Sequence, residues 1–159
     1  MLAHDKSNSK RLACISHNKV HSVEGSRART TILIADDSAE WRTRVREILR
    51  ERPECQVIAE ACDGLEAVQK TSELCPTLVL LDIGMPALNG IEAAKRIRRH
   101  SPSAKIIFVT QETDPDIRIA ALATGAEGFL LKANAGNELL RAVEDASPNG
   151  HDARPRFRQ

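Results

Sequence analysis

The sequence predicts an α/β protein built on a doubly wound, five-stranded parallel sheet. Between residues 31 and 143, apolar runs of strand length alternate five times with segments of helical periodicity. This alternation is typical of parallel strands joined by helices that cover both faces of the sheet through right-handed crossovers. The middle run, "TLVLL" at 77–81, contains no alternating polar residues. It has the pattern of a central strand that is buried on both faces.

Each expected strand is a short and mostly apolar run. The strands are expected at 31–35, 56–61, 77–81, 105–109 and 128–132. Between them, apolar residues recur three or four positions apart, as on the buried side of a helix. These residues are Trp41, Val45, Ile48 and Leu49 in the first helix, Leu65 and Val68 in the second, Ile91, Ala94 and Ile97 in the third, and Leu139, Leu140 and Val143 in the fifth.

Capping residues and turn residues mark where helices begin and end. Asn89 precedes the third helix and carries a side chain suited to cap it. The fourth helix is expected to begin at Asp114-Pro115, because proline is favoured at the first helical position. Gly125 is expected to end that helix.

The two ends of the chain differ in composition from the part between them. Residues 1–29 are polar, lack periodicity and hold six lysines and arginines against two acids, which predicts a disordered, basic N-terminal extension. Residues 147–159 form a short basic C-terminal tail. The predicted domain, 30–146, holds 14 basic and 19 acidic residues. An acidic domain is not typical of proteins that bind nucleic acid.

The sequence shows no feature of a membrane or zinc protein. No stretch approaches the roughly 20 apolar residues of a membrane span, and the first residues lack the apolar segment of a signal peptide. We therefore expect a cytoplasmic protein without membrane contact. The four cysteines and five histidines do not stand at the spacings of zinc ligands.

Polar residues follow four of the five expected strands. Asp36 and Asp37 follow the first strand, Asp82 the third, Thr110 the fourth and Lys132 the fifth. Each has a common structural explanation when taken alone, since Asp often caps a helix and Lys often points to water. The carboxyl ends of parallel strands lie at one edge, where ligands of doubly wound sheets bind. We therefore expect all five side chains to form one site.

The expected site has the chemistry of phosphoryl transfer. Three clustered carboxylates repel one another unless a cation lies between them, and oxygen ligands select Mg²⁺ or Mn²⁺ over zinc. Lys132 adds a positive charge and Thr110 a hydrogen-bond donor for phosphoryl oxygens. Asp82 is the expected nucleophile, because the central strand places it in the middle of the cluster.

These segments resemble the receiver domain of two-component response regulators. The resemblance lies in "ADD" at 35–37, "LLDIGMPALNGIEAAKRIR" at 80–98, "VTQ" at 109–111 and "GFLLKA" at 128–133, and it covers residues 30–146. The amino-acid sequences of these segments are most similar to those of receivers attached to helix-turn-helix transcription regulators. The resemblance implies the flavodoxin-like (βα)5 fold with strand order 2-1-3-4-5.

The resemblance also implies roles for the acidic residues. Asp82 is the implied phosphoacceptor, which takes a phosphoryl group from a sensor histidine kinase or a phosphotransfer protein. Asp37, Asp82 and the backbone carbonyl of Gly84 are the implied Mg²⁺ ligands, while Asp36 acts largely through water. The chain would then be no enzyme beyond promoting its own phosphorylation and dephosphorylation.

Three further positions carry the implied response to phosphorylation. Lys132 pairs with the phosphoryl group, Thr110 closes on it, and Phe129 turns inward when Thr110 moves. A downstream protein is expected to contact the face formed by the fourth helix, the fifth strand and the fifth helix.

Positions beside the phosphoryl group are expected to tune how long it lasts. In the resembled family, the residues two past the phosphoacceptor and two past the switch threonine flank the path of the attacking water; here they are Gly84 and Glu112. Gln111 is bulkier than the family's usual small residue. We expect this bulk to slow hydrolysis more than an exposed, mobile Glu112 accelerates it.

The sequence fits three other classes of protein less well than it fits a receiver. Aspartate-nucleophile phosphatases need a second Asp two residues after the nucleophile, where this chain has Gly84. Dinucleotide-binding proteins need a glycine-rich turn after the first strand, but "ADDSAE" has no glycine. A pseudo-receiver that works without phosphorylation would not need the complete set of site residues. Only thirteen residues follow position 146, so we expect no helix-turn-helix domain, which needs roughly 60, and no direct DNA binding.

Overall fold

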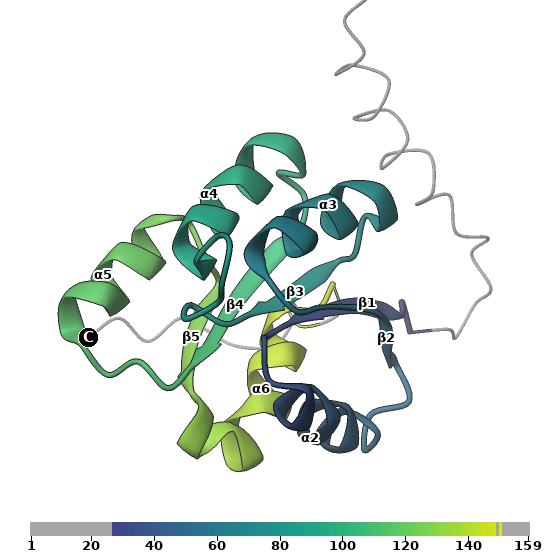
Figure 1. The fold of residues 1–159 in the computed structure, drawn as a ribbon. Coiled ribbons are helices and arrows are strands. Elements are labelled where there is room, and N and C mark those ends of the chain that lie inside the picture. Colours follow the sequence, from purple (N-terminus) through teal and green to yellow (C-terminus); the bar gives the residue numbers. More distant parts are fainter. Residues whose placement is uncertain (1–26, 149, 151–159) are drawn as a thin grey trace, which may run out of the picture.

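A computed structural model describes residues 27–148 and residue 150 of the chain. Its five strands are all parallel and lie in the order β2-β1-β3-β4-β5, with helices on both faces (Figure 1). The predicted fold class and strand order are therefore confirmed. Most of the predicted basic extension and tail lies outside the described residues, so the division of the chain at 29 and 146 stays a prediction.

The elements follow the predicted alternation closely. The strands are β1 (Thr30–Ala35), β2 (Cys55–Ala61), β3 (Leu78–Leu81), β4 (Lys105–Thr110) and β5 (Gly128–Leu131). The helices are α2 (Ala39–Leu49), α3 (Gly64–Leu74), α4 (Gly90–His100), α5 (Pro115–Ala123) and α6 (Ala135–Ala146), with one 3₁₀ turn, η1 (Lys132–Asn134), between β5 and α6.

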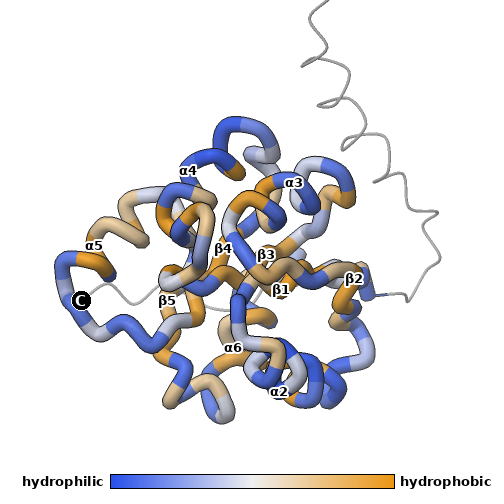
Figure 2. The backbone as a smooth tube through the Cα atoms, in the orientation of Figure 1, coloured by the Kyte–Doolittle hydropathy of each residue, from blue (hydrophilic) through white to orange (hydrophobic). Residues whose placement is uncertain are grey.

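The sheet separates two apolar cores. On one face, α3, α4 and α5 pack against alternate residues of the strands, among them Val79 and Phe108, both fully buried. On the other face, α2 and α6 pack against the residues between, among them Ile34 and Leu80. Figure 2 shows the consequence, an apolar sheet between helices that carry their polar residues outward. Burial on both faces makes the sheet a rigid base for residues at its edge.

The predicted capping residues stand where they were expected. The Asn89 side chain accepts a hydrogen bond from the backbone N–H of Glu92 at 3.0 Å, and Pro115 opens α5. Gly125 adopts a φ of +86° just after α5, in the left-handed region that glycine occupies at low cost. The helix boundaries are thus set by local sequence as well as by packing.

The loop between β3 and α4 depends on a close approach of two backbone segments. A Cβ atom on Gly90 would lie 1.9 Å from the carbonyl oxygen of Asp82, so a glycine is required there. The backbone N–H groups of Met85 and Gly90 both donate to the carbonyl of Ile83, at 2.9 and 2.8 Å. The loop folds back on the end of β3 and fixes the backbone at Asp82.

Ala87, in the same loop, has a φ of +64°, which costs a residue with a Cβ atom about 1 kcal/mol or more. We predict that Ala87→Gly raises the free energy of unfolding by about 1 kcal/mol, measured by urea denaturation. The matched control is Ala120→Gly, in an exposed position of α5, which should lower stability by about 1 kcal/mol. Equal losses in both variants would show that Ala87 is not strained.

Candidate functional site

The structure brings the five predicted site residues to one edge of the sheet, as the parallel topology requires. Four of these five positions are buried or nearly so; Asp37 is exposed. An open cleft of about 420 Å³ lies over this edge. It is lined by Asp37, Ser38, Asp82, Gly84, Thr110, Gln111, Glu112 and Lys132.

Three carboxylates converge at this edge. Asp36 is 1% exposed and Asp82 is 6% exposed, and carboxylate oxygens of these two residues and of Asp37 lie within 4.8 Å of one another. Burial raises the pKa of Asp36, and the charge of Asp82 raises it further. Hydrogen bonds from Lys132 and from the backbone of Ser38 oppose this rise but do not cancel it. The carboxylates are held together at an electrostatic cost.

Lys132 supplies the positive charge among these acids. Its ammonium nitrogen lies 2.6 Å from Asp36 Oδ2 and 3.3 Å from Asp82 Oδ2, and its side chain is only 11% exposed. The same nitrogen lies 5.2 Å from the centre of the Trp41 ring, within the range of a cation–π contact. The buried ammonium and the two buried carboxylates compensate one another's charges. Without the other, either the ammonium or the carboxylates would be a buried charge without compensation.

The second oxygen of each buried carboxylate is bound to the backbone. Asp36 Oδ1 accepts a hydrogen bond from the N–H of Ser38, and Asp82 Oδ1 accepts one from the N–H of Ile83, both at 2.8 Å. Asp37 differs, because no hydrogen bond or ion pair to its carboxylate occurs among residues 27–148. Asp37 is therefore the acid of the cluster that remains available for a ligand.

The loop after β4 corrects one expectation from the sequence. Glu112 is half-buried rather than exposed, and its Oε1 accepts backbone hydrogen bonds from Thr113 at 3.1 Å and Asp114 at 3.3 Å. The N–H of Glu112 in turn donates to the hydroxyl of Thr110 at 3.2 Å. The expectation was wrong because this turn satisfies the carboxylate locally at the start of α5. Gln111 is exposed and lines the cleft.

Phe129 lies on β5, next to Phe108 of β4 in the strand register. Its ring is half-buried against the core under α5, and the guanidinium of Arg118 lies 5.2 Å from the ring centre. The predicted switch role of Phe129 and Thr110 concerns a movement, so it stays a prediction.

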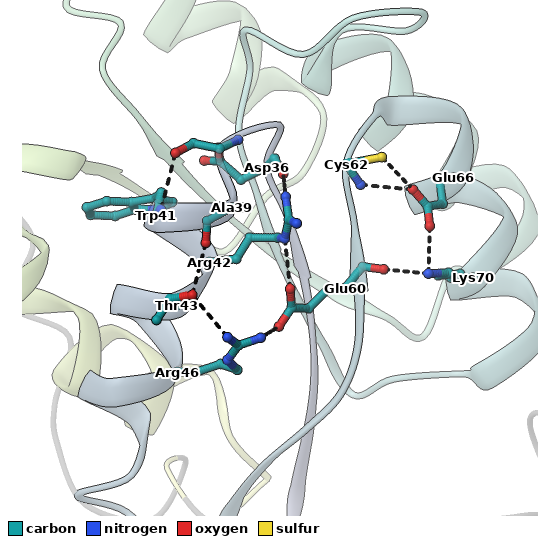
Figure 3. A network of polar contacts seen from close by, with 11 residues as sticks. Asp36, Ala39, Trp41, Arg42, Thr43, Arg46, Glu60, Cys62, Glu66 and Lys70 are labelled. Atoms are coloured by element: carbon teal, nitrogen blue, oxygen red, sulfur yellow. Dashed lines mark hydrogen bonds and ion pairs between the residues drawn. The ribbon is translucent and has the colours of Figure 1, made fainter.

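Two residues near the site were missed by the sequence analysis. Ser38 caps α2, since its hydroxyl accepts the N–H of Trp41 at 3.2 Å; a serine just before a helical pattern is a signal that could have revealed it. Arg42 donates to the carbonyl of Asp36 and to the carboxylate of Glu60 (Figure 3). No local sequence signal predicts this, because its two partners are far apart in the chain.

A second group of potential metal ligands has a structural explanation. Cys62, Asp63 and Glu66 lie close together at the start of α3. The Glu66 carboxylate accepts the N–H of Cys62 at 2.9 Å and pairs with Lys70 at 2.6 Å, and these contacts, the backbone one first, lower its pKa to about 2. Asp63 caps the helix. The group therefore serves to start α3.

Among the helices of the described residues, none has both the length and the apolar character needed to cross a bilayer.

Comparison with known proteins identifies the class. The model of the response regulator receiver domain matches residues 32–144. The nitrate/nitrite response regulator NarL of Escherichia coli is 34% identical over 117 residues, which cover 74% of this chain and 54% of NarL. The chemotaxis protein CheY of Listeria monocytogenes is 37% identical over 116 residues, covering 73% of this chain and 97% of CheY.

A solved structure agrees with the sequence matches. The CheX–CheY–BeF₃⁻–Mg²⁺ complex of Borrelia burgdorferi has a TM-score of 0.70 at 27% identity and covers 74% of this chain and 89% of that chain. The chain therefore belongs to the response regulator receiver domain family of two-component systems. It spans about half the length of NarL and nearly the whole of CheY.

Proposed function

We propose that Asp82 accepts a phosphoryl group from the phosphohistidine of a sensor histidine kinase or a phosphotransfer protein. The observation that carries this is the contact of Lys132 with Asp82 at the floor of an open cleft. An oxygen of Asp82 attacks phosphorus, the bond from phosphorus to the donor nitrogen breaks, and an acyl phosphate forms. Lys132 and the hydroxyl of Thr110 offer donors to the phosphoryl oxygens.

The donor set of the cleft fits Mg²⁺. Three carboxylates converge within 4.8 Å, and neither histidine nor cysteine is among the residues that line the cleft. Hard oxygen ligands suit Mg²⁺, and Mn²⁺ is also accommodated. Asp37, Asp82 and the carbonyl of Gly84 would hold the ion, with Asp36 acting through water. When bound, the ion supplies positive charge that offsets the carboxylates and the phosphoryl oxygens.

We propose this role for residues 30–146. An aspartate-nucleophile phosphatase needs a general acid at the position of Gly84, and glycine cannot supply one. We therefore propose that the chain's own chemistry is limited to gaining and losing the phosphoryl group. The output surface is the face of α5, β5 and α6, which a downstream protein would contact. Ile119 and Leu122 on α5 are 67% and 40% exposed, as suits a surface that binds a partner.

Replacement of Asp82 tests the phosphoacceptor assignment. Labelling with acetyl phosphate in Mg²⁺ buffer should modify the wild-type chain at Asp82, as located by mass spectrometry, and should fail in Asp82→Asn. Asp116→Asn, which changes an exposed aspartate of α5 in the same way, should label normally. Undiminished labelling of Asp82→Asn would disprove the assignment.

Replacement of Asp37 tests the metal site. Mg²⁺ titration should change the fluorescence of Trp41, because its ring contacts Lys132 and an ion among the carboxylates alters the charge around that ammonium. The response should be absent in Asp37→Ala, which removes the available carboxylate. If both proteins respond alike, the ion binds elsewhere.

Replacement of Gln111 tests what sets the lifetime of the phosphorylated state. Water must reach phosphorus in line with the bond that breaks, and Gln111 is an exposed side chain at the cleft. Gln111→Ala should shorten the half-life several-fold, a barrier change of about 1 kcal/mol. The measurement is loss of label from purified phosphoprotein in Mg²⁺ buffer. Gln56→Ala, at an exposed position of β2, is the control; an unchanged half-life in Gln111→Ala would show that its bulk does not restrict water.

A further inference from the structure

A network of charged side chains joins the acidic loop to two helices and the edge strand β2 (Figure 3). Arg42 and Arg46 of α2 both bind the carboxylate of Glu60, Arg42 through Nε at 2.7 Å. Lys70 of α3 donates to the backbone carbonyl of Glu60 at 2.6 Å. Burial raises the pKa of Glu60, but the hydrogen bonds from the two arginines outweigh burial and hold it below its usual value. Glu60 is therefore charged at neutral pH.

Arg42 does more than pair with Glu60. Its Nη1 donates to the carbonyl oxygen of Asp36 at 2.7 Å, while its Nε is held by Glu60. The side chain is 17% exposed, so the contact is shielded from water. The planar guanidinium with two fixed partners holds this carbonyl in one direction, which a single ammonium could not do.

The carbonyl of Asp36 belongs to the peptide that leads into Asp37. The N–H of Asp36 is bound to the carbonyl of Ala61 at 3.0 Å, so both backbone groups of Asp36 are fixed. The Asp37 carboxylate itself is bound by no other group among residues 27–148. An oxygen of this carboxylate lies within 4.8 Å of oxygens of Asp36 and Asp82, and Arg42 binds the peptide group that precedes Asp37.

An irregularity in β2 makes this arrangement possible. Val57 pairs with Ile32 and Ala59 pairs with Leu33, so Ile58 is an extra residue in the strand. Val57 lies on the α2 side of the sheet and Ala59 on the α3 side. In a regular strand these two side chains would share a face. The bulge turns Glu60 toward α2, where the two arginines reach it.

We propose that Arg42 is a positioning residue for the metal site: by binding the carbonyl of Asp36 while anchored on Glu60, it orients the Asp37 carboxylate for a divalent cation. This inference rests on the proposed function, because it concerns the same ion. Residues that hold metal ligands in place commonly change metal affinity by tenfold or more when replaced.

Simple electrostatics and a positioning role predict opposite changes in Mg²⁺ affinity when Arg42 is replaced. Arg42 carries a positive charge near the place of a divalent cation, so its removal alone should strengthen cation binding. Positioning predicts the opposite result. Arg46 provides the matched control, because it binds the same carboxylate of Glu60, while none of its contacts in the network reaches Asp36.

The experiment measures Mg²⁺ affinity without phosphorylation, by following amide chemical shifts during Mg²⁺ titration. Arg42→Gln should weaken binding about tenfold, and Arg46→Gln should leave it unchanged or slightly stronger. Arg42→Lys keeps the charge but cannot bind both partners in the same way, so it should also weaken binding. This second variant keeps the test open if Arg42→Gln does not fold.

The outcomes separate this inference from the proposed function. If the wild type neither binds Mg²⁺ nor labels at Asp82, the proposed function itself fails. If the wild type does both and the folded Arg42 variants bind Mg²⁺ as tightly as the wild type, only the positioning role is overturned. Equal weakening in Arg42→Gln and Arg46→Gln would also overturn it, since the effect would then come from the stability of the network.

Discussion

The contact of one lysine with two buried aspartates is the interaction on which the site depends. Parallel strands bring Asp36 and Asp82 to the same edge, where burial disfavours their charges. Lys132 lies between them, at 2.6 and 3.3 Å, and arrives from the last strand of the sheet. The site is therefore complete only when the first, third and fifth strands are in register. Folding and function share this requirement.

The backbone around the cluster is as constrained as the charges. Gly90 lets α4 approach the carbonyl of Asp82, and the N–H of Asp82 is bound to the carbonyl of Ala35 at 2.9 Å. Asp36 is held on the other side of β1 by the carbonyl of Ala61. The two buried acids thus sit on fixed backbone, and Asp82 lines the cleft in which we propose that it is phosphorylated. Rigid placement is what allows so few groups to act together.

The sequence was sufficient for the fold and for the residues that meet at the sheet edge. Periodicity predicted the five strands and four of the five helices, Asp114-Pro115 and Gly125 predicted α5, and the 3₁₀ turn η1 was not predicted. The parallel topology also predicted that Asp36, Asp82 and Lys132 lie together. It was not sufficient where side chains choose partners at a distance. The pairing of Arg42 with Glu60 depends on a bulge that moves the following side chains of β2 to the opposite face of the sheet. No residue of β2 predicts this extra position.

The charges of the cluster explain why a divalent cation suits it. Three carboxylates and the single ammonium of Lys132 leave two negative charges uncompensated. Lys132 already contacts Asp36 and Asp82, so the remaining demand falls on Asp37, the exposed member at the cleft. A cation there neutralises the cluster and also prepares it for a phosphoryl group, which brings negative charge of its own. The position of Asp37 then decides how well one ion serves both purposes. Because Asp37 has no side-chain partner among the described residues, that position is set by its backbone, and through the carbonyl of Asp36 by Arg42.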